Sequence, residues 1–159
     1  MRRRQSSTPR QWLIADERLG GELWNALDRL PRGSGVLLMH RNLRKAERAR
    51  LLTKLRREAR RRNLTIVDEA AGGAARVHNM RELRQAASAG APLLFLSPLF
   101  PTRSHPDWTP LPRMRAATLA RLSPVPVIAL GGMDVRRFRR VQRLGFYGWA
   151  GIDAWMLRT

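Results

Sequence analysis

The polar residues Thr102, Ser104 and His105 follow an apolar run, and this pattern is the one best able to support chemistry in the chain. The run Leu93–Leu96 is wholly apolar, and Pro98 then opens a polar loop. A fully apolar run is typical of a buried parallel strand, and α/β sheets bind ligands at the carboxyl ends of their strands. Hydroxyl groups there can donate to a phosphate, and the histidine can gain or lose a charge near neutral pH. The pattern therefore predicts a binding loop; an ordinary surface loop is the alternative.

Two glycine-containing turns repeat this arrangement further along the chain. Gly131 and Gly132 end one apolar run, and Gly151 and Ile152 end the next. Glycine lets a ligand approach the backbone closely, and backbone N–H groups in such a turn can hold a phosphate. Barrels often build a phosphate site from the loops after their last two strands. These turns therefore predict such a site; the alternative is a pair of tight turns that bind nothing.

Three ionisable side chains lie at the ends of other strand candidates. Arg41 follows the second candidate, Asp68 closes the third and His78 follows the fourth. A neutral imidazole near pH 7 suits proton transfer, so His78 is a candidate acid/base group. Each residue also has a purely structural alternative. Arg41 would be a cation at the rim of the sheet, Asp68 a carboxylate paired with arginine, and His78 a hydrogen-bonded histidine.

The elements that would position these residues alternate between strand and helix. Apolar runs indicate strands over residues 11–15, 36–39, 64–67, 76–77, 93–96, 125–130 and 147–150, and helical spacing indicates helices over 20–30, 43–63, 80–89, 113–122 and 133–144. This alternation predicts a parallel α/β sheet with right-handed crossovers. We expect a TIM-barrel-like (β/α)n fold. A closed barrel usually needs about 200 residues, and one β–α unit is missing around Ala70–Ala75.

Length and composition favour a single domain. The chain has 159 residues, of which 43% are hydrophobic, and it has no cysteine. The lack of cysteine excludes disulfides, thiolate metal sites and a cysteine nucleophile, and it fits a cytoplasmic protein. No apolar run reaches the roughly 18 residues that a membrane span needs. Residues 1–10 are basic and lack the apolar stretch of a signal peptide, so we expect a flexible tail there and one domain over residues 11–159.

The formal net charge of +19 predicts contact with polyanions. Phosphorylated small molecules are the favoured partners, and nucleic acid is an alternative. All but two of the 31 basic residues are arginine, which a coding bias explains equally well. The basic helices carry no aromatic stacking platform, so a solvated helix face is the simpler interpretation of their charge.

The segments Leu96–Pro106 and Val125–Met133 together resemble the thiamine-phosphate synthase family and its thiazole tautomerase relatives. Those proteins have a Gly-Pro-Val-Phe-Pro-Thr segment after strand six and a Gly-Gly turn after strand seven. Leu13–Arg18 is similar to the family's first strand, and Val77–Glu82 is similar to its fifth. The resemblance implies a TIM barrel that couples an aminopyrimidine pyrophosphate to a thiazole phosphate and releases pyrophosphate with the help of magnesium. The tautomerase branch instead moves a proton on the thiazole phosphate carboxylate.

The resemblance also implies a role for each candidate residue. Asp68 would bind Mg²⁺, Arg41 would grip pyrophosphate, and His78 would be the acid/base group of the tautomerase branch. Substrate or phosphate binding would fall to Thr102, Ser104, His105, Gly131, Gly132, Gly151 and Ile152.

Several positions depart from the family's pattern. Met39 replaces a cation that contacts pyrophosphate, and Val67 replaces an asparagine beside the metal. His105 stands in place of a lysine, and Asp153 stands where synthases tend to have serine. A carboxylate beside a phosphate repels it unless an arginine pairs with the carboxylate. The family's second acidic metal ligand lies on the fourth β–α unit, which is the missing one.

Three functions follow as alternatives. The first is a thiamine-phosphate synthase-like transferase, and the second is a thiazole phosphate tautomerase-like isomerase that uses His78. The third is a non-catalytic barrel that binds a phosphorylated ligand or nucleic acid. An opened barrel exposes sheet edges, so we also expect that a homodimer could cover them.

Overall fold

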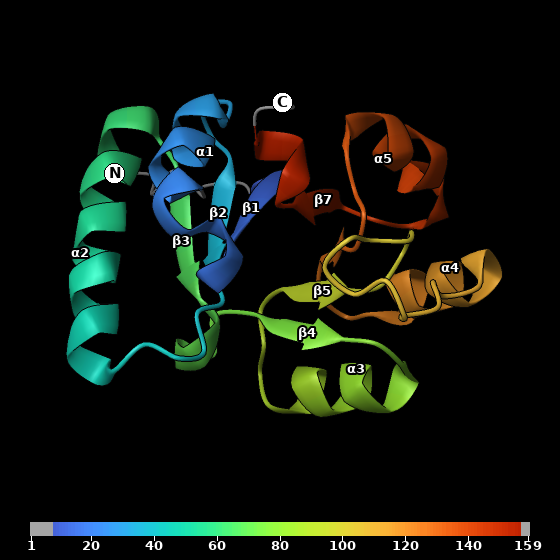
Figure 1. Cartoon of the computed structure of the whole chain (residues 1–159). Coiled ribbons are helices and arrows are strands. Elements are labelled where there is room, and N and C mark those ends of the chain that lie inside the picture. The colour runs from blue at the N-terminus through green and yellow to red at the C-terminus, as the bar shows by residue number, and fades with distance from the viewer. Residues whose placement is uncertain (1–7, 157–159) are drawn as a thin grey trace, which may run out of the picture.

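A computed structural model describes residues 8–156 as a parallel sheet with helices on its outer side (Figure 1). The strands are β1 (Gln11–Ala15), β2 (Gly35–Leu38), β3 (Thr65–Asp68), β4 (Ala75–Val77), β5 (Leu94–Leu96), β6 (Val127–Ala129) and β7 (Gly148–Gly151). The α-helices are α1 (Leu23–Arg29), α2 (Lys45–Arg62), α3 (Met80–Ser88), α4 (Arg113–Leu122) and α5 (Val135–Val141). Short 3-10 helices are η1 (Glu17–Glu22), η2 (Glu69–Ala71), η3 (Gln142–Leu144) and η4 (Asp153–Trp155).

The strands form one seven-stranded sheet in the order β3-β2-β1-β7-β6-β5-β4. Every neighbouring pair is parallel. This is the order of a barrel in which each strand lies beside its predecessor and β1 pairs with the last strand. The structure therefore confirms the α/β, TIM-barrel-like prediction and the strand at each of the seven predicted places.

The barrel stays open between β3 and β4. Only residues 69–74 connect these two strands, whereas a parallel pair needs a crossover of a dozen or more residues. The connector is thus too short to return the chain to the start of a strand beside β3, and the two strands become the edges of the sheet. In Figure 1 the chain runs from the end of β3 through the single turn of η2 to the start of β4.

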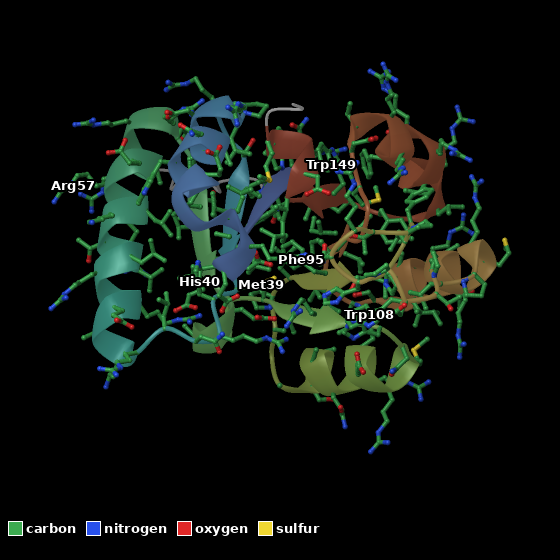
Figure 2. All side chains as sticks on the ribbon, in the orientation of Figure 1. Met39, His40, Arg57, Phe95, Trp108 and Trp149 are labelled. Atoms are coloured by element: carbon green, nitrogen blue, oxygen red, sulfur yellow. The ribbon has the colours of Figure 1, made fainter. Side chains whose placement is uncertain are left out.

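Large side chains fill the inner side of the sheet. Trp12 of β1 and Phe95 of β5 meet edge to face with 5.4 Å between ring centroids. Figure 2 shows Phe95 near the middle of the molecule. Gly35 of β2 makes room for the indole of Trp12, because a Cβ at this position would overlap the ring. The inner cluster also contains Ile14, Leu37, Met39, Ala74, Leu93, Ile128 and Ala150.

The other side of the sheet packs against the helices. Leu13, Leu38, Leu96 and Val127 belong to a larger cluster that includes Leu55 of α2 and other helix residues. Both sides of most strands are therefore buried, as expected for a parallel sheet covered by helices. Within residues 8–156, no helix is long and apolar enough to cross a bilayer.

The helix boundaries correct the sequence prediction at two places. The helix expected over residues 20–30 begins only at Leu23, because Gly20 has φ 47° and ψ −127° and interrupts the helical backbone. The helix expected over residues 133–144 is α5 followed by η3, and Asp134 caps it by accepting from the N–H of Arg137 at 2.8 Å. An aspartate side chain in this position satisfies a backbone N–H that has no partner within the first turn of the helix.

The predicted N-terminal tail lies only partly within the described range. Residues 1–7 are outside it. The carbonyl of Thr8 accepts from the Tyr147 hydroxyl at 2.9 Å, and the carbonyl of Arg10 accepts from the Trp149 N–H at 2.8 Å. Residues 8–10 are therefore joined to the β7 side of the sheet.

Candidate functional site

A cavity of about 680 Å³ opens at the carboxyl ends of the strands. Residues from the segments after β5, β6 and β7 form most of its wall. All seven residues predicted to bind substrate or phosphate line this cavity: Thr102, Ser104, His105, Gly131, Gly132, Gly151 and Ile152. Three loops that are far apart in the sequence thus supply the predicted groups to one place.

The segment after β5 forms one wall of the cavity. The Leu99 N–H donates to the Leu130 carbonyl at 3.0 Å, and the Phe100 N–H donates to the Gly131 carbonyl at 3.1 Å. These bonds attach the start of the segment to the end of β6. Further along, the hydroxyls of Thr102 and Ser104 lie 3.0 Å apart. Each can rotate toward an anion in the cavity.

Trp108 connects this segment to the end of β4. Its indole stacks on the His105 ring at 4.1 Å between centroids with an interplanar angle of 12°. Its edge contact with His78 has 5.7 Å between centroids and an angle of 85°. Figure 2 shows Trp108 close to β4. Residues 101–111, which we call the lid, are therefore held near the sheet by an aromatic contact with His78.

The Gly131-Gly132 turn allows the lid to lie close to the end of β6. Both glycines have positive φ angles, 98° and 58°. A Cβ on Gly131 would lie 2.8 Å from the Cα of Pro98, and a Cβ on Gly132 would overlap the Pro101 carbonyl. Within residues 8–156, neither N–H group of this turn donates a hydrogen bond. The turn thus combines close packing with two donors at the cavity wall.

The segment after β7 brings a carboxylate to the same cavity. Gly151, Ile152 and Asp153 line it, and Asp153 starts η4. Trp155 of η4 is buried, stacks on Trp149 at 5.0 Å and donates to the Trp12 carbonyl at 3.0 Å. These contacts fix η4 against β1. They also fix the position of Asp153, the carboxylate that departs from the family's pattern.

Four arginines that the sequence analysis did not select also line the cavity: Arg18, Arg76, Arg103 and Arg137. Arg18 donates to Asp16 through Nε at 2.9 Å and through Nη2 at 2.5 Å. Arg137 donates to the Gly132 carbonyl and covers the Phe100 ring at 5.3 Å. Arg76 is the one that the sequence could have indicated, because a cation inside a short strand candidate is unusual.

Three predicted residues, Arg41, Asp68 and His78, do not line the cavity. The Arg41 side chain is exposed, and its backbone N–H is held by Glu17. His78 is separated from the cavity by Trp108, which it contacts. The structure therefore brings together the predicted phosphate-binding residues, but not the residues predicted for metal binding and acid/base chemistry.

Asp68 faces α2 instead of the cavity. It is paired in register with Leu38, whose side chain belongs to the helix-side cluster. Its Oδ1 accepts from Arg48 Nη2 at 2.7 Å and from the Ala70 N–H at 3.1 Å. The hydrogen bonds from Arg48 hold the pKa of Asp68 below its usual value.

This arrangement does not fit the magnesium role that the resemblance implies. A Mg²⁺ ion takes one or two carboxylates together with substrate phosphates, but the Asp68 oxygens are occupied by an arginine on the helix side of the sheet. Within residues 8–156, no three His, Cys, Asp or Glu side chains lie close enough together to hold a metal ion. Magnesium therefore stays a prediction from the resemblance.

His78 and Glu82 form a hydrogen-bonded pair at the start of α3. His78 Nδ1 lies 2.8 Å from Glu82 Oε2, and the His78 backbone N–H donates to the same oxygen at 2.7 Å. Burial raises the pKa of Glu82, but the hydrogen bonds from His78 lower it overall. A carboxylate at Nδ1 favours the tautomer with its proton on that atom. His78 Nε2 is buried and has no hydrogen-bond partner in the described part of the chain.

Comparisons with known proteins agree with the fold. The model of a family described as thiamine monophosphate synthase matches residues 73–155. A relative from Aquifex aeolicus (strain VF5) with the provisional name thiamine-phosphate synthase 2 is 32% identical over 79 residues, which are 50% of this chain and 42% of that relative. The chain thus spans less than half the length of this curated relative. The solved structure of thiamine phosphate pyrophosphorylase from Pyrococcus furiosus matches with a TM-score of 0.74 and 21% identity, over 91% of this chain and 86% of that chain.

Proposed function

This chain belongs to the thiamine monophosphate synthase family, and we propose that it acts as a thiamine-phosphate synthase-like transferase. In this reaction an aminopyrimidine pyrophosphate is coupled to a thiazole phosphate, and pyrophosphate is released. The thiazole phosphate would bind in the cavity at the ends of β5, β6 and β7. The convergence of seven predicted residues from three loops on that cavity carries the proposal.

The residues of the cavity suit a phosphorylated ligand. The N–H groups of Gly131 and Gly132 can donate to phosphate oxygens, as can the hydroxyls of Thr102 and Ser104. The lid lies over the same space and would exclude water from the bound ligand. Catalysis would consist mainly of positioning the thiazole against the pyrimidine while cationic side chains hold the departing pyrophosphate.

Magnesium is part of this proposal only as a prediction. It would supply positive charge to the pyrophosphate leaving group if it bound. Asp68 as placed does not fit this role, so in this proposal the cationic side chains that line the cavity hold the leaving group.

The proposal is tested by incubating the chain with both substrates, with and without Mg²⁺, and measuring thiamine phosphate by chromatography. We expect product formation and a higher KM for the thiazole phosphate in Ser104→Ala. Ser123→Ala is the matched control, because Ser123 donates to the Val125 carbonyl at 2.7 Å and does not line the cavity. Absence of both product and thiazole phosphate binding would overturn the proposal.

The His78–Glu82 pair supports a second candidate function, a tautomerase-like proton transfer. Glu82 orients the imidazole and leaves Nε2 without a partner in the described part of the chain. A lone pair on that nitrogen can accept a proton once Trp108 moves away from it. We expect isomerisation of a thiazole phosphate carboxylate without the pyrimidine substrate, a large loss of turnover in His78→Gln and a smaller loss in Glu82→Gln. Full turnover in His78→Gln would exclude this candidate.

A further inference from the structure

Arg76 differs from the other arginines of the cavity in its position. It pairs in register with Phe95, and Phe95 pairs with Ile128; both of these belong to the inner cluster. Cross-strand partners share one face of a sheet, so Arg76 stands on the inner side of β4. Its side chain is only 18% exposed and lines the cavity. A guanidinium is thus held within the opened barrel.

A single carboxylate holds this guanidinium. Arg76 Nε donates to Glu69 Oε1 at 2.8 Å, and Glu69 begins η2 directly after β3. The pair joins the two edges of the sheet where the barrel is open. Burial raises the pKa of Glu69 above its usual value, and the positive charges of Arg41 and Arg48 offset only part of this rise. Glu69 therefore engages one nitrogen of the Arg76 guanidinium at the open edge of the barrel.

The Nη groups of Arg76 donate to no atom within residues 8–156. Asp16 takes donors from both Nε and Nη2 of Arg18. Arg137, like Arg76, donates through one nitrogen, but its acceptor is the Gly132 carbonyl in the cavity wall, and its guanidinium lies over the Phe100 ring. Arg103 lies on the exposed lid. Two parallel N–H groups of a guanidinium match two oxygens of a phosphate. Arg76 therefore has donors available for a bound anion on the inner side of the sheet.

We propose that Arg76, positioned by Glu69, is the main cationic anchor for a phosphate or pyrophosphate group in the cavity, and that this anion binds without a divalent metal. The proposal rests on the proposed function, because it assumes a phosphorylated ligand in this cavity. It is also consistent with the position of Asp68, because a site that needs no metal does not require this carboxylate, which is paired with Arg48. Two carboxylates line the cavity as well, but Asp134 caps α5, and Asp153 lies in the segment after β7, away from the β4 edge.

The opposing interpretation is that the Arg76–Glu69 pair only closes the gap between β3 and β4. Both roles predict lower stability when one partner is removed, since an unpaired buried charge is costly. Only the anchor role predicts an effect on anion affinity that is separate from stability.

The test is calorimetric titration of the chain with inorganic pyrophosphate, in EDTA and in MgCl₂. We expect similar affinity in both buffers, and affinity about 10- to 100-fold lower in Arg76→Gln, as for the loss of charge-assisted hydrogen bonds. Arg61→Gln is the matched control, because Arg61 is 72% exposed on α2 and loses the same charge far from the cavity. Arg76→Lys and the double variant Glu69→Gln/Arg76→Met provide binding data if Arg76→Gln does not fold.

The outcomes separate the two proposals. Binding of pyrophosphate only with Mg²⁺, no binding by the unaltered chain, or unchanged affinity in all folded Arg76 variants overturns the anchor role. If Arg76-dependent binding is present but no thiamine phosphate is formed, the anchor role holds and the proposed transferase fails. If product is formed with unchanged kinetics in Arg76→Lys and in the double variant, the transferase stands and the anchor role fails.

Discussion

At the scale of single residues, the side of the sheet that a residue faces was harder to predict than its place at a strand end. Thr102, Ser104 and His105 lie in a loop, so their position after β5 was enough to place them at the cavity. Asp68 is the last residue of β3, and the residues before it, Ile66 and Val67, are both apolar. A strand covered on both sides shows no alternation of polar and apolar residues. The sequence therefore contained no signal that Asp68 points to α2.

The Arg48–Asp68 pair leads to a prediction about stability. The two side chains are 17% and 11% exposed, so Asp68→Asn should lower the free energy of unfolding by about 1–3 kcal/mol at neutral pH. Asp28→Asn is the control, because Asp28 is 79% exposed and lies 3.5 Å from Arg62; exposed pairs contribute about 0–1 kcal/mol. Urea unfolding measures both. Equal losses in the two variants would contradict a special contribution from Asp68.

The same pair predicts how stability depends on pH. The pKa of Asp68 is lowered in the folded state, so its contribution is fully present above the unfolded pKa of about 3.9 and is lost as the pH falls through the lower folded value. The stability difference between the original chain and Asp68→Asn should therefore shrink as the pH falls from about 4 toward 2. Urea unfolding across this range checks it. A constant difference would show that Asp68 does not titrate with a lowered pKa.

At the scale of elements, apolar runs located the strands well because each one is buried in the sheet. The short 3-10 helices were missed, since they depend on local backbone geometry such as the positive φ of Gly20. The packing of the lid was also missed. Trp108 is 43% exposed, and its contact with His78 joins two segments that no local pattern relates.

The lid contact predicts a change in local opening. Trp108→Ala removes the contacts of the indole with His105 and His78. The lid should then open locally more often, so trypsin should cleave after Arg103 several-fold faster. Trp24→Ala is the control, since Trp24 is similarly exposed at 36% but lies on α1. The cleavage rate is read by mass spectrometry. Equal cleavage in both variants would mean that the aromatic contact does not hold the lid.

The turn after β6 predicts a second effect on the lid. Gly132→Ala places a Cβ against the Pro101 carbonyl at φ 58°, so it should cost about 1–3 kcal/mol and displace the lid. Gly90→Ala also has a positive φ, 83°, but its Cβ would meet nothing within 4 Å. Gly90→Ala should therefore lower stability only through the backbone strain of a positive φ, with no contribution from a steric clash. Thermal unfolding together with the trypsin assay separates the two variants, and identical behaviour would show that contact with the lid is unimportant.

At the scale of the whole molecule, the missing β–α unit was predictable because it is a matter of chain length. Residues 69–74 leave no room for a helix and a returning strand. What the sequence did not show is how the gap is bridged, since the Arg76–Glu69 pair joins residues on the two edges of the sheet. The barrel order and the loops that line the cavity thus followed from the sequence, whereas the charge pairs inside the fold required the structure.

The large positive charge leads to the last prediction. Arg50, Lys54, Arg57 and Arg61 are exposed and follow helical spacing along one side of α2, and their positive charge should attract nucleic acid at low salt. Trp24 is exposed and lines the same pocket as Lys54 and Arg57. One indole can stack on a single base only, so we expect weak binding of single-stranded DNA without sequence preference, with a steep dependence on salt.

Replacing all four α2 residues by glutamine should reduce the slope of log K against log salt by up to about 3, at roughly 0.7 per phosphate contact. Fluorescence anisotropy with a labelled oligonucleotide measures this slope. The control variant has glutamine in place of four arginines that are exposed on α4, α5 and η3: Arg121, Arg136, Arg139 and Arg143. It loses the same total charge as the α2 variant. An equal reduction in both variants would show that binding follows net charge, whereas a larger effect on α2 would locate the polyanion surface there. The absence of binding at low salt would exclude a nucleic-acid partner and leave the cavity as the place where the positive charge acts on a phosphorylated ligand.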